Sequence, residues 1–104
     1  MESGNKLYRG TYIYNNGDYY AGSFRNNLRA DEGKAYFTNG DIYDGNWKED
    51  KMNGLGVYYF GGFSTGEKYD GYWVNNRMEG NGTYTTAQGY IITGIWENNK
   101  HKSW

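Results

Sequence analysis

The sequence repeats one short pattern four times: an aromatic or aliphatic residue, any residue, glycine, any residue, and an aromatic residue. The copies begin at Tyr20, Tyr43, Tyr69 and Ile92, so they lie 23, 26 and 23 residues apart. A period of this length is typical of proteins in which repeated supersecondary units stack side by side and share one core. We therefore expect one repeat domain over the whole chain.

A second motif follows the first at a constant offset and reads glycine, any residue, glycine, any residue, tyrosine. It is complete at 54–58 and 80–84, and the fragment 10–12 is a leading half copy. In the copy at 31–35, which lies between this half copy and 54–58, Asp31 replaces the first glycine and Ala35 replaces the tyrosine. Each period therefore contains two short segments that carry glycine and aromatic residues.

Two kinds of polar turn separate these segments, Asn-Gly as at 16–17 and 39–40, and Asn-Asn as at 26–27 and 75–76. Both kinds tolerate a positive φ at the central positions and suit the tight turns of β-hairpins. The sequence therefore predicts an all-β chain, folded as a single-layer twisted antiparallel sheet of consecutive hairpins. About eight strands are expected, at 8–14, 19–24, 33–38, 42–47, 56–60, 68–73, 82–86 and 90–96.

Side chains alternate between the two faces of a strand, so Tyr43, Gly45 and Trp47 share one face while Asp44 and Asn46 share the other. Glycine weakens a strand unless something needs the space that it leaves. Its repetition between aromatic residues predicts that a ring from the next strand lies over each glycine.

Composition excludes several kinds of site. The chain has no cysteine and one histidine, His101, so neither a disulfide nor a zinc site is expected and no cofactor is implied. The carboxylates lie at turns or opposite the aromatic face, and no catalytic motif is present, which indicates a protein that is not an enzyme. A pI near 5.7 argues against nucleic acid, because surfaces that stack bases are also positively charged.

The two motifs together resemble the MORN repeat (membrane occupation and recognition nexus), whose unit of about 23 residues reads Tyr-X-Gly-X-Trp, a polar turn, and Gly-X-Gly-X-Tyr. Units would cover 20–42, 43–68 and 69–91, with half units at 7–19 and 92–104. The resemblance implies a half-pipe with aromatic residues along its concave floor, and a non-catalytic adaptor or scaffold. With no targeting signal or 18-residue apolar stretch, we expect a cytoplasmic protein, with cytoskeletal or membrane association as further alternatives.

An exposed apolar groove marks a partner site, and tyrosine and tryptophan are enriched at binding hot spots. One hypothesis is that a peptide or helix of a protein partner binds in the concave groove. The alternative is that these residues have only a structural role and form the hydrophobic core of the sheet. The residues in question are Tyr20, Phe24, Tyr43, Trp47, Tyr58, Tyr69, Trp73, Tyr84 and Trp96.

Two other ligands deserve comparison with a protein partner. A carbohydrate would suit aromatic platforms with Asn and Asp at their margins. An anionic lipid headgroup would need four to eight clustered basic residues, and acidic residues are interspersed among the basic ones here. The candidate lipid rim, at the Asn-Asn turns, comprises Arg25, Arg29, Lys48, Lys51, Arg77, Lys100 and Lys102.

The open edges of such a sheet carry unpaired backbone groups that can pair with another chain, so a homodimer is a further expectation. The sequence stops where the next Gly-X-Gly strand would begin. Three interpretations remain open for this end: Trp104 folds back as a cap, the array continues in a longer protein, or the edge pairs with a neighbour.

Overall fold

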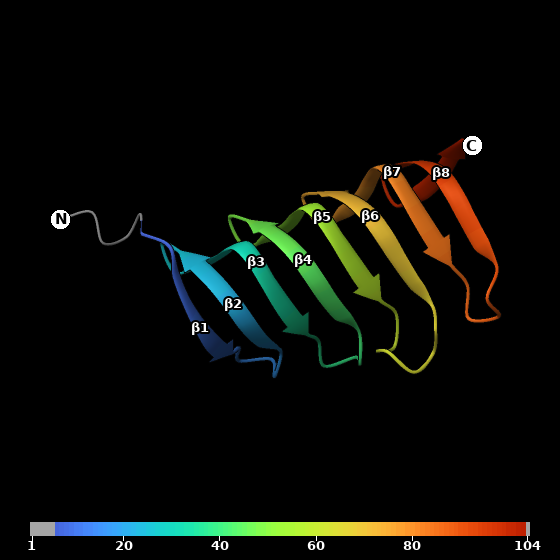
Figure 1. Ribbon diagram of the computed structural model, residues 1–104. Coiled ribbons are helices and arrows are strands. Elements are labelled where there is room, and N and C mark those ends of the chain that lie inside the picture. Colours follow the sequence, from blue (N-terminus) through green and yellow to red (C-terminus); the bar gives the residue numbers. More distant parts are fainter. Residues whose placement is uncertain (1–5, 104) are drawn as a thin grey trace.

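The computed structural model describes residues 6–103, and every regular element in this range is a strand. The strands form one antiparallel sheet in which each pairs with its neighbours in sequence (Figure 1). No helix in the described range is long and apolar enough to span a membrane. The nine strands are β1 (Tyr8–Ile13), β2 (Tyr19–Arg25), β3 (Leu28–Tyr36), β4 (Ile42–Lys48), β5 (Lys51–Tyr59), β6 (Lys68–Val74), β7 (Arg77–Thr85), β8 (Ile91–Glu97) and β9 (Lys100–Ser103).

The predicted fold class is confirmed, but the sequence misplaced the starts of β3, β5 and β7 by five residues and missed β9. The reason is the geometry of the turns that precede these strands. Asn75 and Asn76 have φ angles of 49° and 71°, and a turn with positive φ at both central residues closes a hairpin in two residues. Strand pairing therefore resumes at once, well before the Gly-X-Gly motif. Trp104, considered above as a cap, lies outside the described residues.

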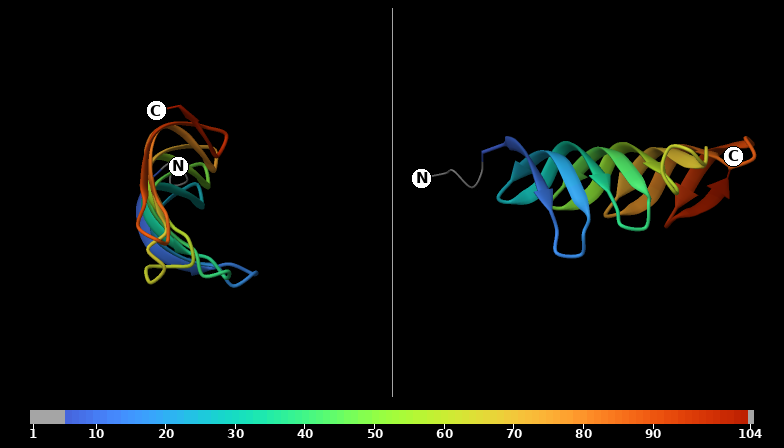
Figure 2. Two further views of the ribbon diagram at one scale, coloured as in Figure 1. Left: turned by 90° about the vertical axis from the view of Figure 1, so that its right-hand side faces the viewer. Right: turned by 90° about the horizontal axis from the view of Figure 1, so that it is seen from below.

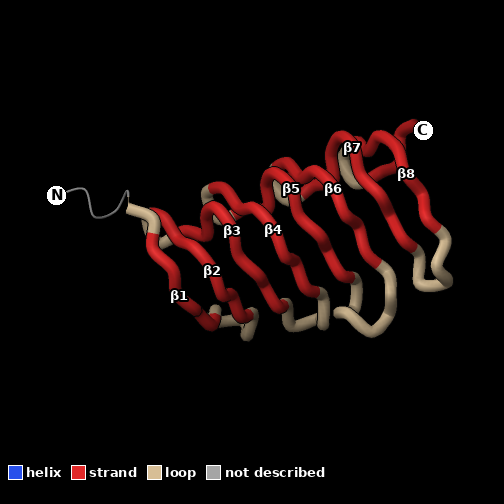
Figure 3. The backbone as a smooth tube through the Cα atoms, viewed as in Figure 1, coloured by secondary structure: helices blue, strands red, loops and turns tan. Residues whose placement is uncertain are grey.

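One row of glycines crosses the sheet from β1 to β8, because each glycine pairs with a glycine on the next strand. Glycines and bulges allow a sheet to curve strongly. The ribbon curls into a half-pipe with extents of 49 × 25 × 17 Å, and the loops lie along its two long margins (Figures 2 and 3). The row consists of Gly10, Gly22, Gly33, Gly45, Gly56, Gly71, Gly82 and Gly94.

A bulge follows each Asn-Asn type of turn between β2 and β7. In the β4–β5 hairpin, Gly45 pairs with Gly56 and Trp47 pairs with Met52, so three residues of β5 face one residue of β4. The middle one, Gly54, has a φ of 102°, and only glycine adopts that backbone conformation without strain. This glycine therefore serves the bulge, and the prediction of an overlying ring is wrong for it. The equivalent positions are also left-handed, namely Asp31 (φ 62°) and Gly80 (φ 78°).

The second glycine of the motif makes room for a buried tyrosine. A Cβ atom on Gly56 would lie 2.1 Å from the hydroxyl oxygen of Tyr43 on the preceding strand, and Gly33 and Gly82 are covered in the same way at 1.9 and 2.1 Å. An overlying ring is therefore confirmed at these three glycines, but it comes from the preceding strand and not from the next one. The Tyr43 hydroxyl donates a hydrogen bond to the carbonyl oxygen of Asn46, the residue that faces the bulge, at 2.8 Å.

Each buried tyrosine is enclosed between two rings, one from its own unit and one from the next. Tyr43 contacts Trp47 and Trp73 edge-on, with ring centroids 5.1 and 5.5 Å apart, a favourable arrangement for aromatic pairs. Repetition of this contact produces a continuous line of rings, here called the core row: Phe24, Tyr20, Trp47, Tyr43, Trp73, Tyr69 and Trp96.

Candidate functional site

The core row accounts for seven of the nine residues predicted to line the groove, and none of its seven side chains is more than 7% exposed. The enclosure is completed by hydrogen bonds to the backbone: the Trp73 indole nitrogen, for example, donates to the carbonyl oxygen of Gly56 at 3.2 Å. A partner in the groove would therefore meet little of these rings. Trp73→Ala would remove core packing, so it cannot separate binding from folding.

Burial also sets the acid–base behaviour of the core tyrosines. It raises the pKa of Tyr20 and of Tyr69 from 10.0 to about 12. The pKa of Tyr43 is raised as well, again chiefly by burial. These hydroxyl groups therefore stay neutral hydrogen-bond donors at physiological pH and are poor candidates for proton transfer.

The concave surface that remains accessible is a second line of half-buried apolar side chains, nearer the turns that contain glycine. These side chains pack against the core row, and four of them contact one another. The ring centroids of Phe37 and Tyr58 are 6.0 Å apart, and that of Phe60 lies 4.9 Å from Tyr58 and 5.6 Å from Tyr84. We call this line the groove row, which comprises Tyr14, Phe37, Tyr58, Phe60, Tyr84 and Ile92.

Carboxylates along one margin hold two members of the groove row in place. The Tyr58 hydroxyl donates a hydrogen bond to Asp41 Oδ2 at 2.7 Å, and the Tyr84 hydroxyl donates one to Glu67. Burial first, and then the adjacent carboxylate, raises the pKa of both tyrosines. The hydroxyl groups are thereby engaged at the margin, which leaves the ring surfaces as the contact area of the groove.

Sequence reasoning identified Tyr58 and Tyr84 but missed the other four members of the groove row. A signal was present, because Phe37 and Phe60 stand two residues after Ala35 and Tyr58 and so share their face of the strand. Phe37 and Phe60 lie just before the Gly turns and outside both motifs, whereas Ile92 begins the fourth copy of the first motif. An extension of the alternation beyond the motifs would have found Phe37 and Phe60.

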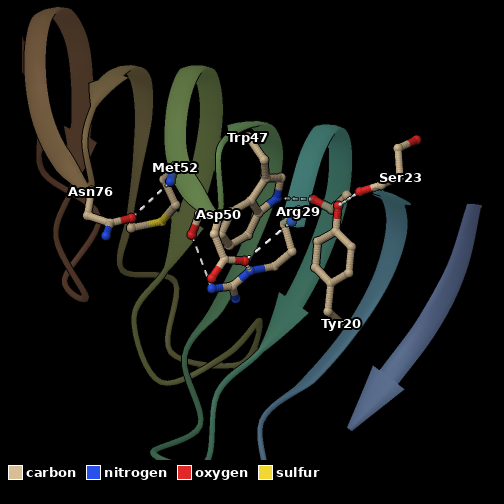
Figure 4. Close-up of polar contacts among 8 residues, drawn as sticks. Tyr20, Ser23, Arg29, Trp47, Asp50, Met52 and Asn76 are labelled. Atoms are coloured by element: carbon tan, nitrogen blue, oxygen red, sulfur yellow. Dashed lines mark hydrogen bonds and ion pairs between the residues drawn. The ribbon is translucent and has the colours of Figure 1, made fainter. Parts of the chain in front are cut away.

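The first unit departs from the others through an ion pair inside the groove (Figure 4). Arg29, predicted to lie on the lipid rim, instead projects over the aromatic floor. Its guanidinium carbon lies 4.4 Å from the ring centroid of Trp47 and 4.9 Å from that of Tyr14. Its Nε atom lies 2.6 Å from Asp50 Oδ1, and its side chain is only 15% exposed. A cation thus sits among rings, with one carboxylate as its partner.

The equivalent positions in the next unit are Met52 and Asn76. Figure 4 shows both pairs: Asn76 Oδ1 accepts a hydrogen bond from the Met52 backbone nitrogen at 2.8 Å, and Asp50 Oδ1 makes the same contact with the Arg29 backbone nitrogen at 3.3 Å. The third unit repeats the pattern with methionine and asparagine. Arginine and aspartate therefore replace methionine and asparagine together, which keeps the backbone contact and adds a charge pair.

We expect the two substitutions of this pair to be strongly coupled. Asp50→Asn should destabilise the fold by about 1 kcal/mol, because it leaves the Arg29 guanidinium without its carboxylate. Adding Arg29→Met should restore stability to at least the original value, since the pair then matches the two later units. Urea unfolding of the two single variants and the double variant measures the coupling. Additive effects would show that the ion pair contributes nothing.

The remaining residues of the predicted lipid rim are exposed, and two of them lie close to acidic side chains. Arg77 Nε lies 3.8 Å from Glu79, and Lys102 Nζ lies 2.9 Å from Glu97. Acidic residues therefore neutralise part of the rim. The other four rim residues lie at strand ends that flank the turns: Arg25, Lys48, Lys51 and Lys100.

Within residues 6–103, no group of three or more acidic or histidine side chains is placed to hold a metal ion. The fold defines an open, single-layer repeat protein of β-hairpins with an apolar concave face. A family model of the MORN repeat matches residues 9–19, 20–42, 43–65 and 69–89, and the chain belongs to the MORN-repeat family. No curated protein matched the chain. MORN repeats are non-enzymatic modules that generally act as scaffolds in contact with proteins or membranes.

Proposed function

We propose that this protein is a scaffold that binds a peptide or a helix of a protein partner along the groove row. The observation that carries the proposal is the division of the aromatic residues into two lines. The core row is enclosed, and none of its side chains is more than 7% exposed. The groove row lies on top of it, half-buried, and presents apolar ring surface that no other part of the described chain covers.

The chemistry of this surface favours a segment with an apolar side. Ring surfaces of Tyr and Phe bury large areas at little cost in conformational entropy, which makes them effective anchors in protein interfaces. An α-helix with its side chains is about 10–12 Å wide, which is narrower than the 25 and 17 Å extents of the curled ribbon. The Arg29–Asp50 pair at one end of the floor gives the groove a polar contact, which would orient the bound segment.

Photo-crosslinking in the native cell can identify the partner, with the crosslinking residue placed either at position 60 in the groove or at position 55 on the convex face. The identified protein is then purified and its affinity for two variants is measured. We expect Phe60→Thr to weaken binding about tenfold, whereas Leu55→Thr should leave it unchanged. Leu55 is 51% exposed on the convex face, which makes it a matched control.

Phe60→Thr is suitable because threonine, as Thr86, occupies the equivalent position in the next unit, where its backbone nitrogen makes the same type of turn contact. The fold should therefore survive the change. Equal affinities of the two variants would refute the proposal. Binding of phosphoinositide vesicles or of glycans that depends on Phe60, with no protein crosslinked from position 60, would replace the protein partner with a membrane or a carbohydrate.

A further inference from the structure

The two edges of the sheet differ in how they are protected against pairing. β9 is four residues long and contains Lys100 and Lys102, and short, lysine-bearing strands are a common protection of sheet edges. β1 has six residues, all exposed, with neither lysine nor proline. In the described range it pairs with β2 alone. β1 is therefore the edge at which another strand can add.

The glycine of β1 also lacks the ring that covers its equivalents. A Cβ atom on Gly10 would meet only Phe24 Cε1, at 3.9 Å, whereas on Gly33 and Gly56 it would lie 1.9 and 2.1 Å from a tyrosine hydroxyl. A hollow of about 460 Å³ occupies this place, lined in part by Tyr8, Gly10 and Phe24. The empty space is the one that a tyrosine from a preceding strand fills in the later units.

The sequence of β1 matches what such a strand must carry. Tyr8, Gly10 and Tyr12 form an aromatic, glycine, aromatic pattern that reads the same in both directions. Two antiparallel copies paired with Gly10 opposite Gly10 would place Tyr8 of each opposite Tyr12 of the other. Elsewhere in the sheet, glycine pairs with glycine in this way and Tyr43 stands opposite Tyr58. The same strand can therefore act as both partners.

We propose that two copies of this chain join through β1, with Gly10 on the two-fold axis, so that the row of glycines continues from one copy into the other. An axis perpendicular to the sheet keeps the concave faces on the same side. The two groove rows would then form one surface of twice the length. The inference does not depend on what the groove binds.

The joining of the copies requires a local change in Tyr8. At present its hydroxyl donates a hydrogen bond to Asn27 at 2.7 Å and its ring stacks on Phe24 at 5.5 Å. To cover Gly10 of the other copy, the ring must rotate away from these contacts. The Tyr8 side chain is 43% exposed, so the rotation moves a ring that is only partly packed, and the new position buries it. The stack on Phe24 is lost in exchange.

The same register fixes which charged residues meet. Arg9 of one copy stands opposite Thr11 of the other, on the convex face, and this contact occurs twice. A lysine at position 11 therefore places like charges opposite each other, while a glutamate places opposite charges there. Each such cross-strand charge pair changes the free energy of association by a measurable amount, and the dimer contains the pair twice. The sign of the effect depends on the register.

Sedimentation equilibrium of the 104-residue chain from micromolar to sub-millimolar concentration tests the proposal. We expect a reversible dimer that Gly10→Ala weakens at least about tenfold, because the added methyl group fills the space that the tyrosine needs. Thr11→Lys should raise the dissociation constant roughly three- to tenfold, and Thr11→Glu should not raise it. Lys102→Ala, on the opposite edge, should have no effect.

Three results would overturn the proposal: a monomer at all concentrations, a dimer that Gly10→Ala does not weaken, or equal effects of lysine and glutamate at position 11. A dimer that tightens with Lys102→Ala would move the contact to β9. Gly10→Ala is expected to leave the folded monomer intact, and circular dichroism of each variant checks this. If it does not, the charge pair at position 11 still decides the register.

Discussion

Gly56→Ala is expected to destabilise the fold by about 3 kcal/mol, the upper part of the usual range for overpacking a core. The new methyl group would lie 2.1 Å from the Tyr43 hydroxyl oxygen and 2.4 Å from its Cζ atom. The ring has nowhere to move, since Tyr43 is 0% exposed and lies between Trp47 and Trp73. It would have to give up these contacts and its hydrogen bond to the carbonyl facing the bulge.

Gly10→Ala is the matched control for this prediction, because it makes the same substitution at the same place in the motif. Here the methyl group would meet one atom at an ordinary contact distance of 3.9 Å. The free energy of unfolding should change by less than about 0.5 kcal/mol. Both values come from urea unfolding followed by circular dichroism at low micromolar concentration. Similar losses in the two variants would show that the overlying ring is not what requires glycine.

The fold could be predicted because its signals are local and repeated. The spacing of 23 to 26 residues, the two kinds of polar turn and the alternation of rings with glycine point to the same hairpin repeat, and such agreement between levels specifies a structure. The bulge could not be predicted in this way. The bulge breaks the period-2 alternation of the strand. In the sequence it is marked only by the first glycine of Gly-X-Gly, which cannot be told apart from a glycine required for packing.

The candidate site was harder to predict than the fold because its composition depends on curvature. Tyr43 and Tyr58 have the same residue type and share the concave face, yet one is enclosed and the other is half-buried. The difference comes from the neighbouring rings that the curled sheet brings together. Arg29 was assigned to the rim for a related reason: the strand start was placed five residues too late, so the equivalence of Arg29 with Met52 was not visible.

Raising the pH from 10 to 12 is expected to unfold the chain cooperatively. Tyr20 and Tyr69 have a pKa of about 12 in the folded state, against 10.0 for an ordinary tyrosine, so ionising each ring costs about 3 kcal/mol more when folded. Below pH 10 both states keep the protons, and stability does not depend on these groups. Between pH 10 and 12 the unfolded chain loses protons that the folded chain retains, and the unfolded state is increasingly favoured.

Absorbance of phenolate at 295 nm and circular dichroism, recorded over the same pH series, should therefore show part of the tyrosine ionisation appearing only with loss of the sheet. Tyr69→Phe identifies the source. This substitution should reduce the steepness with which the unfolding free energy falls with pH in this window by about 1.4 kcal/mol per pH unit. Lysines and the other tyrosines contribute equally to the original protein and to the variant, so they cancel in the comparison. An unchanged slope, or complete ionisation of all tyrosines with the sheet intact, would mean that water reaches the core row. The tyrosine rings would then not be enclosed by their neighbours, and that enclosure could not explain why glycine is required beneath each ring.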